Sequence, residues 1–232
     1  MFAEPKDKSA IRCERKFDLS LAEGELIENQ IYHHPAIFRQ AYPSRFVNSI
    51  YFDGPDLGCY HDNVVGAKSR HKIRLRWYGS LLGKTLVPRL EFKIKDGVSG
   101  WKVIYSMPVF ELREGIDSNQ VCDYVGNSEI GQRPKLIIKT MHPVLLIRYR
   151  RSYFLSSCGR FRLTLDSSLE YYFVHSLANS FINFVSDRHK RILEMKYSIG
   201  SDDYADSVSN YFPFRVTKSS KYVSAVKNLR MA

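Results

Sequence analysis

Charged and apolar residues alternate in six short segments of the sequence. In residues 71–79, Lys72, Arg74 and Arg76 alternate with apolar side chains, and in residues 89–95 the charged positions include Glu91. In a β-strand this alternation puts charged side chains on one face and apolar side chains on the other. Arg and Lys dominate the charged faces, and such cations suit phosphate oxygens, which an arginine fork contacts in pairs. The pattern recurs, in places less regularly, in residues 10–19, 145–154, 160–166 and 191–198.

Two explanations fit one such strand, but six together favour one of them. A single strand could turn its charged face to solvent and its apolar face to a core. A solvated sheet face, however, usually mixes small polar residues with both signs of charge, whereas these faces are mainly cationic. A closed barrel with the charges inward would have a basic bore. Because crowded cations repel one another, we expect such a bore to hold a polyanion.

The elements that position these strands form a β-rich α+β fold. Residues 19–32 and 107–126 have helical character, and a shorter helix is expected after Ser201. Residues 46–63 predict an apolar strand, a turn at Gly54 and Pro55, and a short helical or looped stretch. We find no linker and no internal repeat, so a single domain over residues 1–232 is expected.

Composition limits the classes of partner and compartment. The chain has 35 Lys and Arg against 24 Asp and Glu, a formal charge of +11, which favours nucleic acid, acidic membrane or phosphate chains as partners. The four cysteines lie far apart without a CxxC pair, which indicates neither a zinc site nor a disulfide framework. No secretion signal or membrane-spanning segment is predicted, so a cytoplasmic location is expected.

Eight short strings, in this order and spacing, resemble the VTC domain of polyphosphate polymerases, within the triphosphate tunnel metalloenzyme superfamily. The resemblance runs over nearly the whole chain. Its strings are CERKF at 13–17, SIYFD at 49–53, YHDN at 60–63, IRLRWYG at 73–79, LEFKIK at 90–95, RLTLDSSL at 162–169, LEMK at 193–196 and KSSKY at 218–222.

The resemblance implies a closed, antiparallel, eight-stranded tunnel with helices packed outside, which binds ATP, triphosphate or polyphosphate lengthwise. The family's catalytic phosphate-binding positions match Arg74, Arg76, Lys93, Arg151 and Arg162. Further substrate-binding positions match Lys16, Lys196, Lys218, Ser220 and Lys221. A divalent cation, Mg or Mn, would bind Glu194, with Glu14 as the second candidate.

The sequence departs from the superfamily pattern in two places. Many members begin with ExExK, whereas this chain has Arg12, Glu14 and Lys16, which favours the VTC type over the CYTH-type hydrolases. A further family lysine aligns with Tyr105, although Lys102 lies close by. Asp166 and Glu91 could each lie near the metal or pair with an arginine.

Several functions remain open at this point. The implied activity is polyphosphate polymerase, and the alternatives are a triphosphate hydrolase and a domain that only binds polyphosphate. A nucleic-acid-binding module is a weaker alternative, because no recognised motif occurs and the basic residues sit on many short strands. His33 and His34 precede Pro35 and are read as a polar loop rather than a metal pair. Oligomeric state is open, and any membrane partner would be a separate polypeptide.

Overall fold

The computed structural model describes residues 12–97 and 99–231, and β-strands dominate them. The strands are β1 Arg12–Leu19, β2 Arg39–Asp53, β3 Ser69–Tyr78, β4 Gly83–Thr85, β5 Arg89–Asp96, β6 Ser99–Ser106, β7 Phe110–Leu112, β8 His142–Leu155, β9 Arg162–Phe173, β10 Val185–Asp187 and β11 Arg191–Ser198. The helices are α1 Leu21–Tyr32, α2 Gly58–Val65, α3 Ser118–Gly126, α4 Gln132–Ile138, α5 Asp202–Asn210 and α6 Lys221–Asn228, with a 3-10 turn at Ile199–Ser201. No helix in this described part of the chain is long and apolar enough to cross a membrane.

Eight strands follow one another in the main sheet in the order β1-β11-β9-β8-β2-β3-β5-β6, with β10 attached to β9. The pairs with defined register are antiparallel, as the family resemblance implies. β4 and β7 form a separate two-stranded sheet.

The prediction that hydrogen bonds close this sheet into a barrel is wrong. β1 and β6 are its two ends, and no pairing joins them among the described residues. The edge of β1 that faces away from β11 carries another segment. Phe17 forms a bridge with Val216, and the Thr217 N–H donates to the Lys16 carbonyl at 2.7 Å. Because this segment uses backbone groups of β1, they cannot pair with another strand.

The described residues pack into two compact units. The first comprises residues 12–45, 149–169 and 187–219, and the second comprises 46–148, 170–186 and 220–231. The expectation of a single domain over residues 1–232 stays a prediction.

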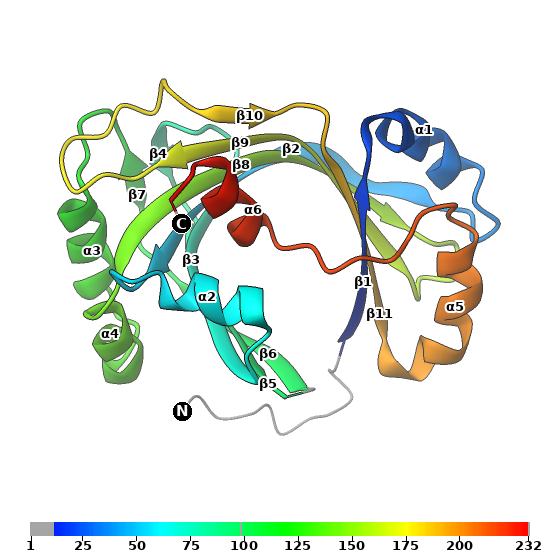
Figure 1. The fold of residues 1–232 in the computed structure, drawn as a ribbon, viewed down its shortest axis with the longest axis horizontal. Coiled ribbons are helices and arrows are strands. Elements are labelled where there is room, and N and C mark those ends of the chain that lie inside the picture. Colours follow the sequence, from blue (N-terminus) through cyan, green and yellow to red (C-terminus); the bar gives the residue numbers. More distant parts are fainter. Residues whose placement is uncertain (1–11, 98, 232) are drawn as a thin grey trace. The chain divides into compact units, whose positions relative to one another are not determined.

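In the first unit, the apolar faces of β1, β9 and β11 form a core with α1 and α5 (Figure 1). α1 begins at a capping box in which Ser20 and Glu23 bond to each other's backbone N–H groups. It then buries Ile27 and Ile31, which lie one helical turn apart. The apolar face of these strands is therefore covered, and the other face carries Glu14, Lys16, Glu194 and Lys196.

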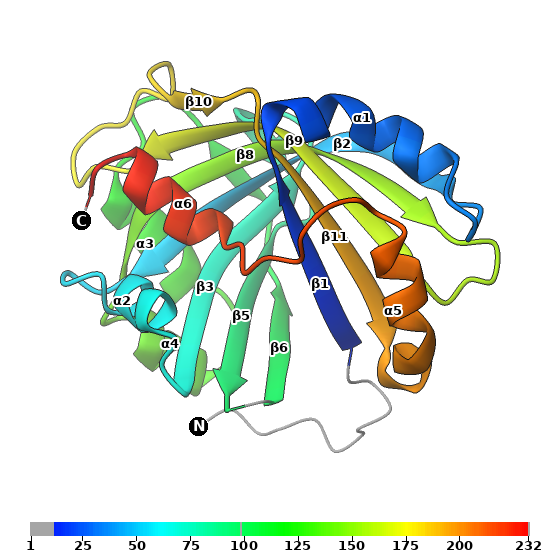
Figure 2. The ribbon, with the colours of Figure 1, turned by 45° about the vertical axis from the view of Figure 1, so that its right-hand side comes forward.

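In the second unit, β2, β3 and β5 run side by side (Figure 2), and their register separates apolar from charged side chains in the same way. Ile50, Leu75 and Leu90 lie opposite one another and are fully buried. The N-terminal end of α6 lies against the charged face, since Ser220 accepts a hydrogen bond from Lys72. The sheet thus presents charged side chains next to α6.

Candidate functional site

Three lysines form a row across the sheet of the second unit. The register places Lys72 of β3 opposite Lys93 of β5, and Lys93 opposite Lys102 of β6. Lys72 Nζ also donates to Ser220 Oγ at 2.8 Å. Like charges directly opposite each other destabilise a sheet. An anionic ligand would relieve that repulsion.

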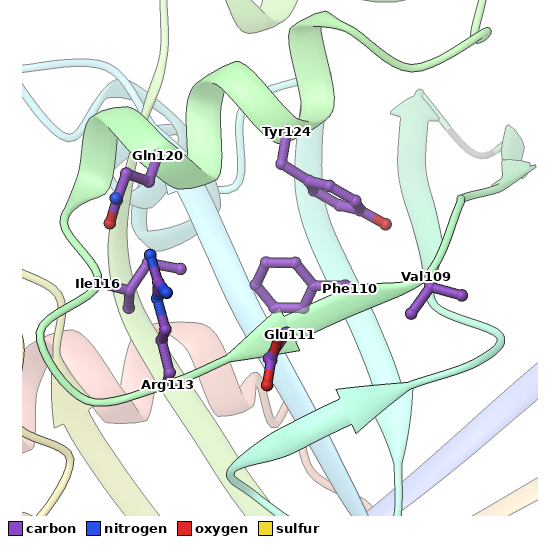
Figure 3. Close-up of a pocket in the computed structure, with 7 residues that line it drawn as sticks. All are labelled: Val109, Phe110, Glu111, Arg113, Ile116, Gln120 and Tyr124. Atoms are coloured by element: carbon purple, nitrogen blue, oxygen red, sulfur yellow. The ribbon is translucent and has the colours of Figure 1, made fainter.

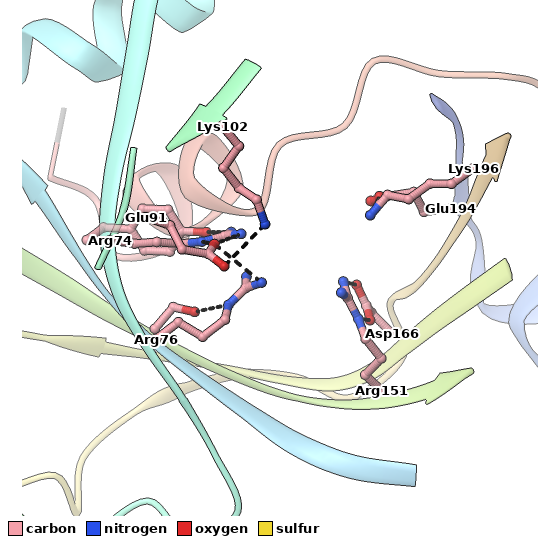
Figure 4. A network of polar contacts seen from close by, with 10 residues as sticks. Arg74, Arg76, Glu91, Lys102, Arg151, Asp166, Glu194 and Lys196 are labelled. Atoms are coloured by element: carbon pink, nitrogen blue, oxygen red, sulfur yellow. Dashed lines mark hydrogen bonds and ion pairs between the residues drawn. The ribbon is translucent and has the colours of Figure 1, made fainter. Parts of the chain in front are cut away.

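Next to the lysine row, three cations surround the carboxylate of Glu91 (Figure 4). Arg74 approaches Glu91 Oε2 with Nε at 2.7 Å and NH2 at 2.6 Å, and Arg76 NH1 lies 3.6 Å away. Lys102 Nζ is 3.4 Å from Oε1. Three positive charges and one negative charge leave a surplus of two in this set. Glu91 therefore pairs with arginine, one of its two predicted roles.

Electrostatics in this cluster follow from burial and crowding. Burial alone would raise the pKa of Glu91, but Arg74, Arg76 and Lys102 lower it to about 2. The pKa of Lys102 is lowered, first by burial and then by the two arginines, although Glu91 opposes this. The cluster consequently keeps its carboxylate ionised across the ordinary pH range.

Lys102, rather than Tyr105, supplies the cation of β6. Tyr105 lies opposite Leu90 on the apolar face and contacts the Phe92 ring edge-on at 5.9 Å. Lys102 lies on the charged face opposite Lys93. β6 therefore still contributes a positive charge to this face, although Tyr105 stands at the position of the family lysine.

Two further residues of this charged face were not predicted to belong to the site. Ser49 Oγ accepts from Arg76 Nε at 3.3 Å, and the Tyr51 hydroxyl accepts from Arg74 NH1 at 3.1 Å. The signal was present in the sequence, because Ser49 and Tyr51 alternate with buried apolar residues and so share one face of β2.

In the first unit, Arg151 is paired with Asp166 by two hydrogen bonds (Figure 4). Nε donates to Oδ1 at 2.6 Å and NH2 donates to Oδ2 at 2.7 Å, and Asp166 is fully buried. Burial would lower the pKa of Arg151, but the Asp166 carboxylate raises it well above its ordinary value. Asp166 thus orients an arginine, which was one of its two predicted roles.

The two predicted metal ligands lie with two lysines on β1 and β11. The register places Lys16 opposite Glu194 and Glu14 opposite Lys196. Lys196 Nζ is 2.5 Å from Glu194 Oε1, and Lys16 Nζ is 2.6 Å from Glu14 Oε1 and 3.9 Å from Glu194 Oε2. The ammonium group of Lys16 therefore bridges both carboxylates. The two glutamates together stabilise a positive charge at this position.

The remaining predicted residues lie on β9, in the segment before α6 and at the start of α6. Arg162 lies opposite Lys196 in the register of β9 and β11. Lys218 is exposed in the segment before α6, and Ser220 caps that helix by accepting from the Val223 N–H. Lys221, the first residue of α6, has an electrostatic effect on Tyr51.

His34 lies in the core of the first unit. Its Nε2 lies 3.0 Å from the Val208 carbonyl and its Nδ1 accepts from the Ala36 N–H at 3.0 Å. Both ring nitrogens are thus occupied by backbone groups. Within the described residues, no three His, Cys, Asp or Glu side chains gather as a metal-binding group.

A pocket of about 210 Å³ lies beside β7 and α3, and none of its lining residues belongs to the cationic clusters (Figure 3). Its lining includes the Phe110 and Tyr124 rings together with Glu111 and Arg113. A single arginine beside a glutamate gives it no cationic surplus, so it is no candidate for a phosphate chain.

Comparison with models of known protein families shows to which family this chain belongs. A model of the VTC domain matches residues 11–230. The chain belongs to the VTC domain family. The match confirms the resemblance drawn from the sequence strings.

Solved structures support the triphosphate tunnel fold of the VTC domain. A candidate adenylate cyclase from Bacillus halodurans has a TM-score of 0.54 at 11% identity, over 92% of this chain and 96% of that one. A candidate adenylyl cyclase from Hippeastrum, described as having dominant triphosphatase activity, has a TM-score of 0.53 at 12% identity, over 94% and 96%. A Pyrococcus horikoshii protein has a TM-score of 0.51 at 11% identity, over 95% and 100%. No curated protein matches the chain in sequence.

Proposed function

We propose that this VTC domain binds triphosphate and polyphosphate and transfers the γ-phosphoryl group of ATP to the end of a polyphosphate chain. The observation that carries the proposal is the set formed by Arg74, Arg76 and Lys102 around Glu91. Two unit charges 4 Å apart interact by about 4 kcal/mol at an effective dielectric constant of about 20, so a surplus of cations is costly without an anion. A phosphate chain carries the charge that would offset it.

The reaction needs little covalent chemistry from the protein. A terminal oxygen of the polyphosphate attacks the γ-phosphorus, and the bond from that phosphorus to the bridging oxygen breaks, so that ADP leaves. Charge on the transferred group is spread over its oxygens, and guanidinium forks stabilise it by position alone. Arg74 and Arg76 are suited to this because Glu91 holds both in place. No nucleophilic side chain is required.

Glu194 and Glu14 are the residues that would hold Mg or Mn. Each lies within 4 Å of the Lys16 ammonium, so the protein already stabilises a positive charge at both carboxylates. Mg commonly takes only one or two protein carboxylates and completes its sphere with waters and substrate phosphates, so two glutamates suffice. A bound ion would supply further charge neutralisation at the phosphate oxygens.

A triphosphatase is the second candidate. The described triphosphatase activity of the Hippeastrum relative favours it. Water would then replace the polyphosphate end as the attacking group, while the cationic side chains kept the same roles. Binding without turnover is the third outcome, and the cytoplasmic location expected from the sequence stays a prediction.

Phosphorus NMR of the purified protein separates these activities. The protein is incubated with ATP and Mn, and separately with tripolyphosphate and Mn. Growth of the signal of internal phosphates from ATP supports the polymerase, whereas release of orthophosphate alone supports the hydrolase.

Variants identify the residues responsible. Glu194→Ala should abolish turnover, and Glu25→Ala, which removes an exposed carboxylate of α1, is the matched control. If the protein neither converts nor binds ATP and tripolyphosphate, the proposal fails. Full turnover by the Glu194→Ala variant would exclude Glu194 as the essential metal ligand.

A further inference from the structure

A buried aspartate at the end of β2 forms a fixed anchor. The carboxylate of Asp53 accepts from the N–H groups of Gly54 and Cys59 at 2.8 Å and of Tyr60 at 3.0 Å. It also accepts from the Tyr222 hydroxyl at 2.5 Å. Four donors from three parts of the chain leave this carboxylate little freedom to move.

Tyr222 of α6 is held by that anchor and packs on a residue of the charged face. Its side chain is almost fully buried, and its ring stacks on the Tyr51 ring with centroids 5.1 Å apart and planes 15° apart. Burial and the Asp53 carboxylate both raise the pKa of Tyr222, so the hydroxyl stays a donor. The position of the Tyr51 ring thus depends on Tyr222.

Tyr51 in turn contacts Arg74. The Tyr51 hydroxyl accepts from Arg74 NH1 at 3.1 Å, while Nε and NH2 of the same guanidinium face Glu91. Burial would raise the pKa of Tyr51, but the nearby Arg74 and Arg76 lower it. Glu91 and Tyr51 together fix the plane of the guanidinium.

We propose that Tyr222 is a positioning residue for phosphate binding. Held by Asp53, it acts through the stacked Tyr51 ring and orients Arg74 toward the ligand. The inference rests on the proposed function, since it assumes that Arg74 binds phosphate. Orientation matters because a guanidinium fixed before binding loses less freedom on contact with the ligand. It also makes ligand affinity depend on how α6 docks.

A double-mutant cycle tests this dependence. Tripolyphosphate is titrated by calorimetry into wild type, Tyr222→Phe, Arg74→Gln and the double variant. Tyr222→Phe keeps the ring and removes only the bond to Asp53, and we expect roughly three- to tenfold weaker binding. In the Arg74→Gln background the same substitution should have no further effect. Equal weakening in both backgrounds, or none in the first, overturns the proposal.

Two further variants separate positioning from general loss of stability. Tyr51→Phe keeps the ring that stacks on Tyr222 but removes the hydroxyl that accepts from Arg74, and it should weaken binding by the same factor. Tyr124→Phe removes a hydroxyl that donates to the Pro108 carbonyl at 2.7 Å, elsewhere in the same unit, and should leave affinity unchanged. Weakening by Tyr124→Phe as large as that by Tyr222→Phe would also overturn the proposal.

A readout without ligand keeps the test independent of the proposed function. The Nε–H signal of Arg74 is assigned in proton–nitrogen NMR spectra from its absence in Arg74→Gln. In Tyr222→Phe this signal should shift or broaden, while that of Arg151, in the other unit, stays in place. An unchanged Arg74 signal refutes the positioning role. Failure of the wild type to bind tripolyphosphate refutes the proposed function instead.

Discussion

Replacing Glu91 with glutamine should destabilise the ligand-free domain by about 3 kcal/mol. The structure lowers the pKa of this carboxyl from 4.5 to about 2. At about 1.4 kcal/mol for each pKa unit, this corresponds to about 3 kcal/mol of stabilisation at neutral pH. The side chain is only 4% exposed, so solvent screens the interaction little. Removal also leaves the nearly buried Arg76 without this partner, which acts in the same direction.

The pH dependence of this effect has a definite sign. Because the folded protein has the lower pKa, the stabilisation is present above about pH 4.5 and is lost as the pH falls toward about 2. Urea unfolding of wild type and Glu91→Gln, at pH 7 and at pH 3, measures it. The difference between the two proteins should be largest at pH 7 and should shrink at pH 3.

A matched control variant and an added ligand test whether the loss of stability is specific to Glu91. Glu111→Gln changes an exposed carboxylate of β7 in the same unit and should shift stability by less than about 0.5 kcal/mol. Tripolyphosphate should stabilise the wild type, because a ligand that binds only the folded state adds to its stability. If Glu91→Gln is as stable as wild type at pH 7, the reasoning about the cationic set is wrong.

Three other measurements check separate parts of the structure. Asp166→Asn leaves Arg151, whose side chain is only 12% exposed, without its ion pair and should cost about 3–5 kcal/mol in urea unfolding; a loss below about 1 kcal/mol contradicts the pairing. Burial lowers the pKa of His34, although its bond to Val208 opposes this, so stability should fall as the pH drops below about 6.5, and His34→Gln should remove that part of the pH dependence. The Ser156 hydroxyl and then the Arg160 backbone lower the pKa of Cys158 to about 7, whereas burial raises the pKa of Cys59. Iodoacetamide should therefore label Cys158 before Cys59 in the native protein, and equal labelling rates would refute this.

The charged faces could be predicted because they depend only on local geometry. Side chains in a strand alternate with a period of two, so Lys72, Arg74 and Arg76 had to share a face once the segment was recognised as extended. Ser49 and Tyr51 of β2 alternate with Ile50 and Phe52, so the same rule puts both on one face.

The ion pairs and the open sheet could not be derived in this way. Whether Glu91 meets a metal or an arginine depends on the register between β3 and β5, which the alternation within each strand leaves undetermined. The edge of β1 that closure would need is used by Val216 and Thr217, which are distant from β1 in sequence. Contacts between such distant segments carry no local pattern.

The segment at Val216 and Thr217 also protects the domain from its neighbours. An uncovered strand edge offers N–H and C=O groups to any other chain, and natural proteins block such edges to avoid aggregation. Here the residues that cover β1 lead directly into Lys218, Ser220 and Lys221, which are predicted to bind phosphate. One short stretch of chain therefore both covers the edge of β1 and carries residues that are predicted to bind phosphate. A substitution there that exposes β1 would look like a loss of phosphate binding, although its first effect would be self-association.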